Sequence, residues 1–275
     1  MKLIYLGTAA AEGFPALFCQ CPACRRAAAA GGRNLRTRSQ AVVDGQLLLD
    51  FPPDTLYHVQ RYGLNLAEVR HCLITHGHSD HLYAPDLEMR RRDFAYPERE
   101  GALTLYGTGP TGALCEPVIA QYGLAGEGRV RFRQIAAFMP FSAGPYRVVA
   151  LPADHDPRLE PVIYHISDGA RGLLYAHDTG VFPGETWRYL EAERPRIDLL
   201  SLDCNHGPEP HARNHLGLED AARVRDRLAG LGCLANGTAV VNHFSHNGGA
   251  TYDELAPRAA ALGLAVSWDG MEVEA

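Results

Sequence analysis

Short apolar stretches rich in valine, isoleucine and leucine recur along the chain, and turn residues separate them. Stretches of this length and composition predict β-strands. The predicted strands are residues 2–6, 40–43, 47–50, 72–75, 146–151, 162–166, 173–176, 198–202, 239–242 and 265–268. The pair Asp44-Gly45 predicts a tight hairpin between two of these strands, because Asp-Gly suits a primed turn.

Helical patterns lie between some of these strands. Residues 218–231 have the apolar spacing of an amphipathic helix, and residues 253–262 predict another. Residues 55–62, followed by 66–68, lie where a short helix precedes the next strand. No repeat of fixed period and no Pro/Gly-rich linker interrupts the chain. The pattern predicts one α/β domain over residues 1–275, with mixed sheets.

A polar segment with the sequence THGHSDH, from Thr75 to His81, directly follows a predicted strand. On an extended stretch, His76 and His78 project to one side and can converge on one metal ion. Asp80 and His81 lie beyond that turn and can face a second position. Imidazole and carboxylate ligands suit zinc, manganese or iron. The alternative is a histidine-rich surface loop, which this density of ligands behind a buried strand disfavours.

Charge and cysteine content narrow the classes of function. The 275 residues carry 26 basic and 32 acidic side chains, a net charge of −6. This balance makes nucleic acid an improbable partner. The apolar start of the chain is too short for a signal peptide, and no apolar run approaches the length of a membrane span. We expect a cytoplasmic protein whose seven cysteines are free thiols or metal ligands.

Three cysteines form a second concentrated set of ligands: Cys19, Cys21 and Cys24. Thiolates at this spacing can bind a tetrahedral zinc, with one position left for another ligand. Cys21 and Cys24 also have the spacing of a thioredoxin-like redox pair. The third thiol disfavours that interpretation, and so does the lack of a convincing helix after them that would dock in a βαβ unit. Three unrelated buried cysteines are the remaining alternative.

The THGHSDH segment resembles the HxHxDH signature of the metallo-β-lactamase superfamily of dinuclear metallohydrolases. The resemblance implies an αββα sandwich, with two mixed β-sheets flanked by helices and the metals at one edge. It implies that later strand ends supply a histidine, an aspartate and a histidine, for which the chain offers His155, Asp178 and His243. By this resemblance, one metal is held by His76, His78 and His155, the other by Asp80, His81 and His243, with Asp178 bridging. His177 and Asp156 are adjacent competitors.

Gly7-Thr8 and the CxCxxC run resemble the branch of this superfamily that contains the phosphoribosyl cyclic phosphate phosphodiesterases of the carbon–phosphorus lyase pathway. The resemblance implies a structural zinc held by the three cysteines and His246. It also implies that His215 assists catalysis, together with Asp80; a place beside the helix near residue 218 is the alternative role for His215. Residues 83–147 depart from the branch, and the pyrroloquinoline quinone biosynthesis B proteins have a similar cysteine cluster.

Together these features predict a metal-dependent phosphodiesterase that acts on a small cyclic phosphodiester, for which a ribose cyclic phosphate is one candidate. We expect two divalent ions in the active site, zinc or manganese, and one structural zinc. A bridging hydroxide would attack phosphorus. The alternatives are a tRNA 3′-processing endonuclease, a lactone or thioester hydrolase, and a non-catalytic accessory protein. The expected partner is a small-molecule substrate rather than nucleic acid or a membrane, and a homodimer is a reasonable prior.

Overall fold

Two β-sheets packed face to face form the centre of the computed structural model, which describes residues 1–275 apart from the side chain of residue 236. The first sheet has the strand order β14-β1-β2-β3-β4-β5-β6. Its strands are β1 (Lys2–Gly7), β2 (Gln40–Val43), β3 (Leu47–Leu49), β4 (His71–Leu73), β5 (Leu103–Gly107), β6 (Val130–Gln134) and β14 (Met271–Glu274). The strands from β3 to β6 run parallel to one another, and the other neighbours pair antiparallel.

The second sheet has the order β13-β12-β11-β10-β9-β8-β7. Its strands are β7 (Phe141–Ala143), β8 (Tyr146–Pro152), β9 (Val162–Ser167), β10 (Gly172–Ala176), β11 (Ile197–Asp203), β12 (Leu234–Asn242) and β13 (Ala265–Val266). The strands from β10 to β13 are parallel, whereas β7 to β10 form an antiparallel meander. Both sheets are therefore mixed, as the sequence predicts.

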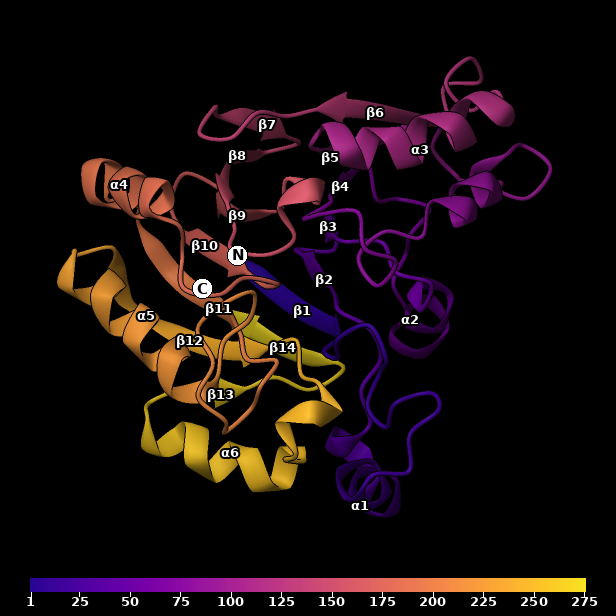
Figure 1. Cartoon of the computed structure of the whole chain (residues 1–275). Helices are drawn as coiled ribbons and strands as arrows, with labels where there is room; N and C mark the ends of the chain where they lie inside the picture. Colours follow the sequence, from indigo (N-terminus) through magenta and orange to yellow (C-terminus); the bar gives the residue numbers. More distant parts are fainter.

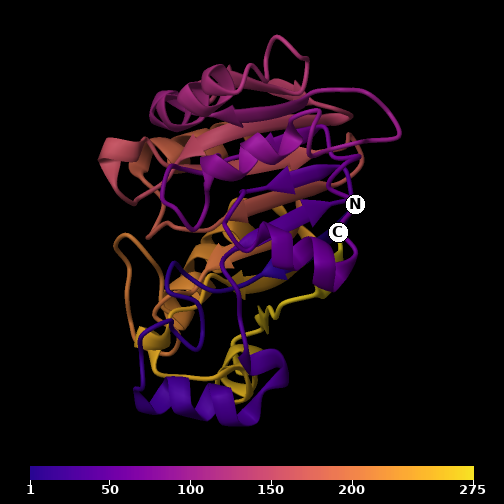
Figure 2. The ribbon, with the colours of Figure 1, turned by 90° about the vertical axis from the view of Figure 1, so that its right-hand side faces the viewer.

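Helices cover the outer face of each sheet, which gives the layer order α/β/β/α (Figures 1 and 2). The α-helices are α1 (Pro22–Ala30), α2 (Thr55–Tyr62), α3 (Gly109–Gln121), α4 (Gly184–Glu193), α5 (Leu218–Gly230) and α6 (Tyr252–Ala261). Short 3-10 helices are η1 (Gly32–Asn34), η2 (Ala84–Arg90), η3 (Pro157–Leu159) and η4 (His246–Gly248). The α-helices α2 and α3 lie on the first sheet, and α4, α5 and α6 on the second.

The leucine run of β3 shows how the sequence produces this sandwich. Leu47 and Leu49 point into the core between the two sheets, and Leu48 points to the core beneath α2 and α3. Successive side chains of a strand face opposite sides, so a strand with both faces covered is apolar throughout. The Asp44-Gly45 hairpin is confirmed: both residues have positive φ, 49° and 69°, as a type I′ turn requires.

Several elements were absent from the sequence-based prediction or differ from it. The strands β5, β6, β7 and β14 and the helices α3 and α4 were not predicted. The helix α1 begins within the cysteine cluster, at Pro22, and was not predicted. Cys21 accepts a hydrogen bond from the backbone N–H of Cys24 as the N-cap, and Pro22 begins a run rich in alanine. This helix packs beside α6 rather than in a βαβ unit (Figure 1).

The two ends of the chain lie together, since the N–H of Ala275 donates to the carbonyl of Met1 at 2.9 Å (Figure 2). The expected αββα fold is confirmed. No helix in the described part of the chain is both long enough and apolar enough to cross a bilayer.

Candidate metal centre

The candidate site lies where strand ends of the two sheets meet. The N–H of Val162 donates to the carbonyl of Thr75 at 3.0 Å, and the Tyr164 hydroxyl donates to the carbonyl of Ile74 at 2.7 Å. These bonds tie the end of β4 to the start of β9. In the second sheet the parallel strands β10, β11 and β12 end together, as their register shows. The loops after these strands therefore project to one edge of the sandwich.

A first group of donors consists of His76, His78 and His155, whose ligand atoms lie within 4.8 Å of one another. The Nε2 atom of His76 is 2.9 Å from Nδ1 of His78, and Nε2 of His155 is 3.2 Å from that same atom. Burial lowers the pKa of His76 well below its usual value, which keeps the imidazole neutral. Neutral imidazole nitrogens turned toward one point form a set that can bind a divalent metal.

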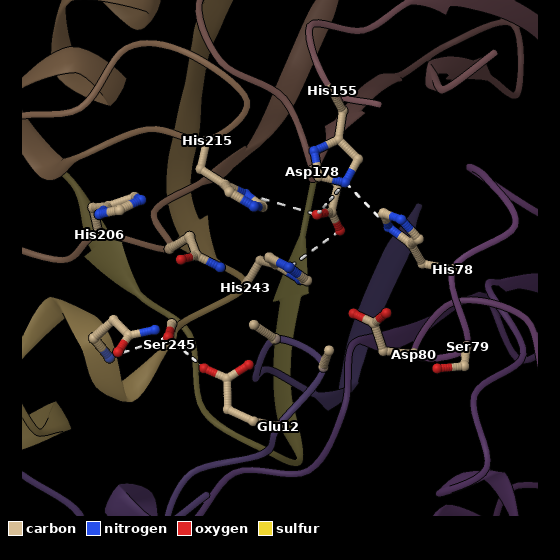
Figure 3. A pocket seen from close by; sticks show the side chains of 14 residues that line it. Glu12, His78, Ser79, Asp80, His155, Asp178, His206, His215, His243 and Ser245 are labelled. Atoms are coloured by element: carbon tan, nitrogen blue, oxygen red, sulfur yellow. Dashed lines mark hydrogen bonds and ion pairs between the residues drawn. The ribbon is translucent and has the colours of Figure 1, made fainter. Parts of the chain in front are cut away.

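A second group lies next to the first and consists of Asp80, His81, Asp178 and His243, all buried. Nε2 of His81 lies 3.2 Å from an Asp80 oxygen and is in close contact with Asp178. Nε2 of His243 is 3.1 Å from Oδ2 of Asp178, and Nε2 of His155 is 3.5 Å from its Oδ1. Asp178 therefore faces both groups, as expected for a bridging ligand (Figure 3).

The second group has two features that suit a bound cation: a concentration of carboxylates around His81, and buried polar atoms without hydrogen-bond partners in the part of the chain that the structure describes. Burial disfavours the His81 imidazolium, but Asp178, Asp80 and Asp50 outweigh burial and raise its pKa well above normal. Among the described residues, the buried atoms Nε2 of His81 and Oδ2 of Asp178 have no well-directed hydrogen bond despite their contact. Carboxylates and imidazoles that converge in this way, with buried atoms unsatisfied, fit a bound divalent ion.

Three of the eight described non-glycine residues with positive φ lie at this centre. Asp50, Asp178 and His243 have φ values of 65°, 49° and 66°, in the left-handed region that non-glycine residues rarely adopt. Each follows a strand of the sandwich, where the chain must turn sharply to bring its side chain back over the sheet edge. Strain of this kind persists only where the surrounding structure enforces it, and it is common at functional sites.

Two supporting carboxylates were not identified from the sequence. Oδ2 of Asp50 is 2.7 Å from Nδ1 of His81, and Asp50 also accepts hydrogen bonds from the backbone and hydroxyl of Thr75. Asp203 accepts from the backbone N–H of Asp178 at 3.1 Å and lies 3.0 Å from Nδ1 of His215. Asp50 follows a buried strand and Asp203 ends one, and this position at a strand end is the sequence signal that the two residues share.

His215 lies in the wall of the site. It belongs to a group with Asp178, Asp203 and His243 whose ligand atoms lie within 4.8 Å of one another. Burial disfavours its charged form, but Asp203 together with Asp178 and Asp80 outweighs that effect and raises the pKa of His215 to about 9. Helix α5 begins with Gly217 as its N-cap, so the side chain of His215 faces the site rather than the helix end.

The two competing residues are turned away from this centre. Nε2 of His177 lies 2.7 Å from the Ser201 hydroxyl, inside the sandwich. Asp156 caps η3 and pairs with Arg158 at 2.7 Å. The structure thus brings together His155 and Asp178, not their neighbours.

The cysteine cluster forms a separate group with His246, and its four ligand atoms lie within 4.8 Å of one another. The Sγ atoms of Cys19 and Cys21 are 3.4 Å and 3.5 Å from Nδ1 of His246. A tetrahedral zinc holds sulfur and nitrogen ligands about 3.5 Å apart, given bond lengths of ~2.3 and ~2.05 Å. The N–H of Cys24 donates to Cys21 and lowers the pKa of that thiol to about 6, which favours the ligating thiolate. This geometry fits a closed metal site better than a redox pair.

A cavity of about 490 Å³ opens over the histidine and aspartate groups (Figure 3). It is lined by Ala10, Ala11, Glu12, His78, Ser79, Asp80, His155, Asp178, Asn205, His206, His215, His243, Ser245 and Asn247. This volume suits a small-molecule ligand. The cysteines do not line it.

Residues 46–244 match the family model described as the beta-lactamase superfamily domain. The chain belongs to this superfamily, and with the donor groups described above it is a metal-dependent hydrolase. The family expected from the HxHxDH motif is confirmed. No curated protein sequence matches the chain significantly.

Solved structures with the same fold extend over the whole chain. A diphosphatase from the PhnP family is 21% identical, with a TM-score of 0.74, and the match covers 100% of this chain and 97% of that one. Zinc-bound PqqB from Methylobacterium extorquens is 21% identical, with a TM-score of 0.74 and 100% of both chains covered. The short form of human tRNase Z is 16% identical, with a TM-score of 0.66, 100% of this chain and 99% of that chain covered. At these identities the matches show a shared fold.

Proposed function

We propose that this protein is a phosphodiesterase that hydrolyses a small cyclic phosphodiester, for which a ribose cyclic phosphate is one candidate. The observation that supports this most is the pair of adjacent donor groups joined by Asp178, with the His215–Asp203 pair beside them. His76, His78 and His155 would hold one ion, Asp80, His81 and His243 the other, and Asp178 would contact both. Divalent ions in such sites supply a nucleophile at neutral pH and stabilise charge on the phosphoryl oxygens.

The protein's own groups complete this reaction. Asp203 lies 3.0 Å from Nδ1 of His215 and favours its protonated form, so His215 can donate a proton to the departing sugar oxygen. Asp203 fixes the orientation of the ring through Nδ1. Asp80 lines the cavity, and its carboxylate accepts a hydrogen bond from the attacking water as well as completing the second donor group.

The three cysteines and His246 would hold a structural zinc. Four protein ligands fill the tetrahedron and leave no position for substrate. The site joins the loop before α1 to the η4 turn, which lies three residues after His243. Its role in this proposal is to hold these two segments together beside the cavity.

A substrate panel tests the reaction class. The metal-loaded protein is incubated with bis(p-nitrophenyl) phosphate, a ribose cyclic phosphate, a lactone, a thioester and a precursor tRNA. The proposal expects hydrolysis of the two phosphodiesters with the highest kcat/KM for the cyclic one. Preference for the lactone or thioester, or for the tRNA, would instead support one of the alternatives given by the sequence. No turnover of any substrate by fully metallated protein would favour an accessory role.

A further inference from the structure

Glu12 places a carboxylate in the wall of the substrate cavity, although no step of the proposed reaction uses it. It lies in the loop after β1, where the N–H of Gly13 donates to the carbonyl of Ala10 and closes a turn. Its side chain is 30% exposed. Figure 3 shows this carboxylate on the side of the cavity away from His155. A ligand that fills the cavity from the histidine and aspartate donors outward would therefore contact Glu12.

Two residues of the neighbouring loop hold this carboxylate in place. The Ser245 hydroxyl donates a short hydrogen bond to Oε1 of Glu12, and Nε2 of His246 lies 3.8 Å from the same oxygen. The other ring nitrogen of His246 faces Cys19 and Cys21. The cysteine cluster thus fixes the His246 ring that stands against Glu12. Ser245 and His246 act as positioning residues for it.

The charge of Glu12 limits what it can recognise. Among the described residues, no arginine or lysine lies within 4.0 Å of this carboxylate. An ionised carboxylate only accepts hydrogen bonds, so it attracts hydroxyl or amine donors and repels phosphate oxygens. In a cavity of about 490 Å³, a phosphate group held by metals at the histidine and aspartate donors would leave another portion of the substrate beside Glu12.

We propose that Glu12 is a specificity residue that accepts hydrogen bonds from hydroxyl groups on the sugar portion of the substrate. The site then selects phosphodiesters of hydroxylated sugars over diesters without donors. This inference rests on the proposed function, because it assumes that the phosphate binds at the metal centre.

The test compares Glu12→Ala and Glu12→Gln with the wild type, using Glu127→Ala on an exposed turn as a matched control. One substrate is adenosine with a cyclic phosphate across its vicinal ribose hydroxyls, which keeps a free hydroxyl and an amine. The other is bis(p-nitrophenyl) phosphate, which has no donor group. The ratio of kcat/KM for the first over the second should fall roughly 10- to 100-fold in Glu12→Ala, the range for hydrogen bonds to charged groups. The fall should appear in KM more than in kcat, and Glu127→Ala should keep the wild-type ratio.

Two further readouts separate this role from structural damage and from failure of the proposed reaction. Metal content is measured in every variant, and Glu12→Gln keeps an oxygen acceptor for Ser245. Loss of metal in both Glu12 variants, or an unchanged selectivity ratio in Glu12→Ala, would overturn the specificity role. If the wild type hydrolyses neither diester, the proposed function fails, and Glu12 is then judged by calorimetric binding of ribose phosphate. Equal affinity in the wild type and Glu12→Ala would refute its role independently.

Discussion

The molecule contains two clusters of metal-ligand residues that are built in opposite ways. The histidine and aspartate cluster comes from strand ends, is largely buried, and opens onto a cavity. The cysteine cluster comes from a loop, the start of a helix and the η4 turn, is partly exposed, and lies outside that cavity. Nitrogen and oxygen donors are typical of catalytic metal sites, which keep a coordination position open for water or substrate. Three thiolates and one imidazole instead fill all four positions of a tetrahedral zinc.

The two clusters also differ in backbone strain. At the first cluster Asp178 and His243 adopt left-handed backbone conformations, and both are held by neighbouring strands. At the cysteine cluster, Cys21 has an ordinary extended conformation as a helix cap. The rigid sandwich thus enforces the geometry of the histidine and aspartate cluster. The cysteine cluster lies where the loop after β1 and the segment after β12 already meet, since the N–H of Ala10 donates to the carbonyl of Phe244 at 2.9 Å.

His76→Ala should have the largest effect, because it should abolish hydrolysis without affecting the cysteine cluster. We expect the rate of bis(p-nitrophenyl) phosphate hydrolysis to fall at least about 10³-fold, because one donor group loses a central ligand. The circular dichroism spectrum and the metal bound by the cysteines should stay as in the wild type. His71→Ala, at the other end of β4, is the control and should remain active. Retained hydrolysis in His76→Ala would show that this cluster is not the reactive one.

Replacing His215 tests the proton donor. In His215→Gln, kcat should fall about 10²- to 10³-fold, since general acid catalysis contributes in this range. The pKa of about 9 sets an upper limit, because bound cations disfavour the imidazolium further. Wild-type kcat should therefore decline as pH rises through a value at or below about 9, where His215 loses its proton. His215→Gln should lack this alkaline decline; a variant that keeps it assigns the decline to another group.

Asp50→Asn should have an intermediate effect on the first cluster. The change keeps an acceptor near Nδ1 of His81 but removes the charge that supports it. Loss of such a supporting carboxylate typically costs about 10–100-fold in metal affinity or activity. Asp226→Asn, a surface carboxylate paired with Arg225, serves as the control. Calorimetric metal titration of both variants measures the effect, and equal affinities would show that Asp50 has no supporting role.

Cys19→Ser should change stability much more than chemistry. We expect loss of one bound metal per chain and a fall in Tm of roughly 5–10 °C, because a structural metal stabilises only the folded state. The kcat for bis(p-nitrophenyl) phosphate should change less than about 3-fold under conditions where the variant is folded, because no cysteine lines the cavity. Cys233→Ser, outside the cluster, should keep its metal. An unchanged metal content and Tm in Cys19→Ser would show that the cysteine cluster does not hold a structural metal.

The sequence was sufficient for those parts of the site where ligand residues follow recognisable strands. The segment from His76 to His81 was found in this way, whereas His155, Asp178 and His243 were assigned because the superfamily resemblance implies such ligands after later strands. The choice of Asp178 over His177 came only from resemblance. In the structure it depends on the left-handed turn at Asp178, which points its neighbour into the sandwich.

Other parts of the fold and of the site could not be predicted, because no local sequence pattern marks them. Helix α3 carries glycines and prolines and has small or apolar residues on its exposed as well as its buried side, so it has no clear amphipathic pattern. Glu12 and Asp203 act through contacts with residues far away in sequence, Ser245 and Asp178 in particular. Such contacts depend on the packing of both sheets, which no short stretch of sequence encodes.

The most direct test of this division of roles is a cobalt titration of metal-free protein, with thiolate-to-cobalt absorption and bis(p-nitrophenyl) phosphate hydrolysis followed together. Soft thiolates should take the first equivalent, so the absorption should saturate near one ion per chain while hydrolysis is still weak. Hydrolysis should then rise as the histidine and aspartate groups fill with further equivalents. Hydrolysis that saturates together with the thiolate absorption at one equivalent, or that never appears at full loading, would show that the histidine and aspartate cluster is not the catalytic one.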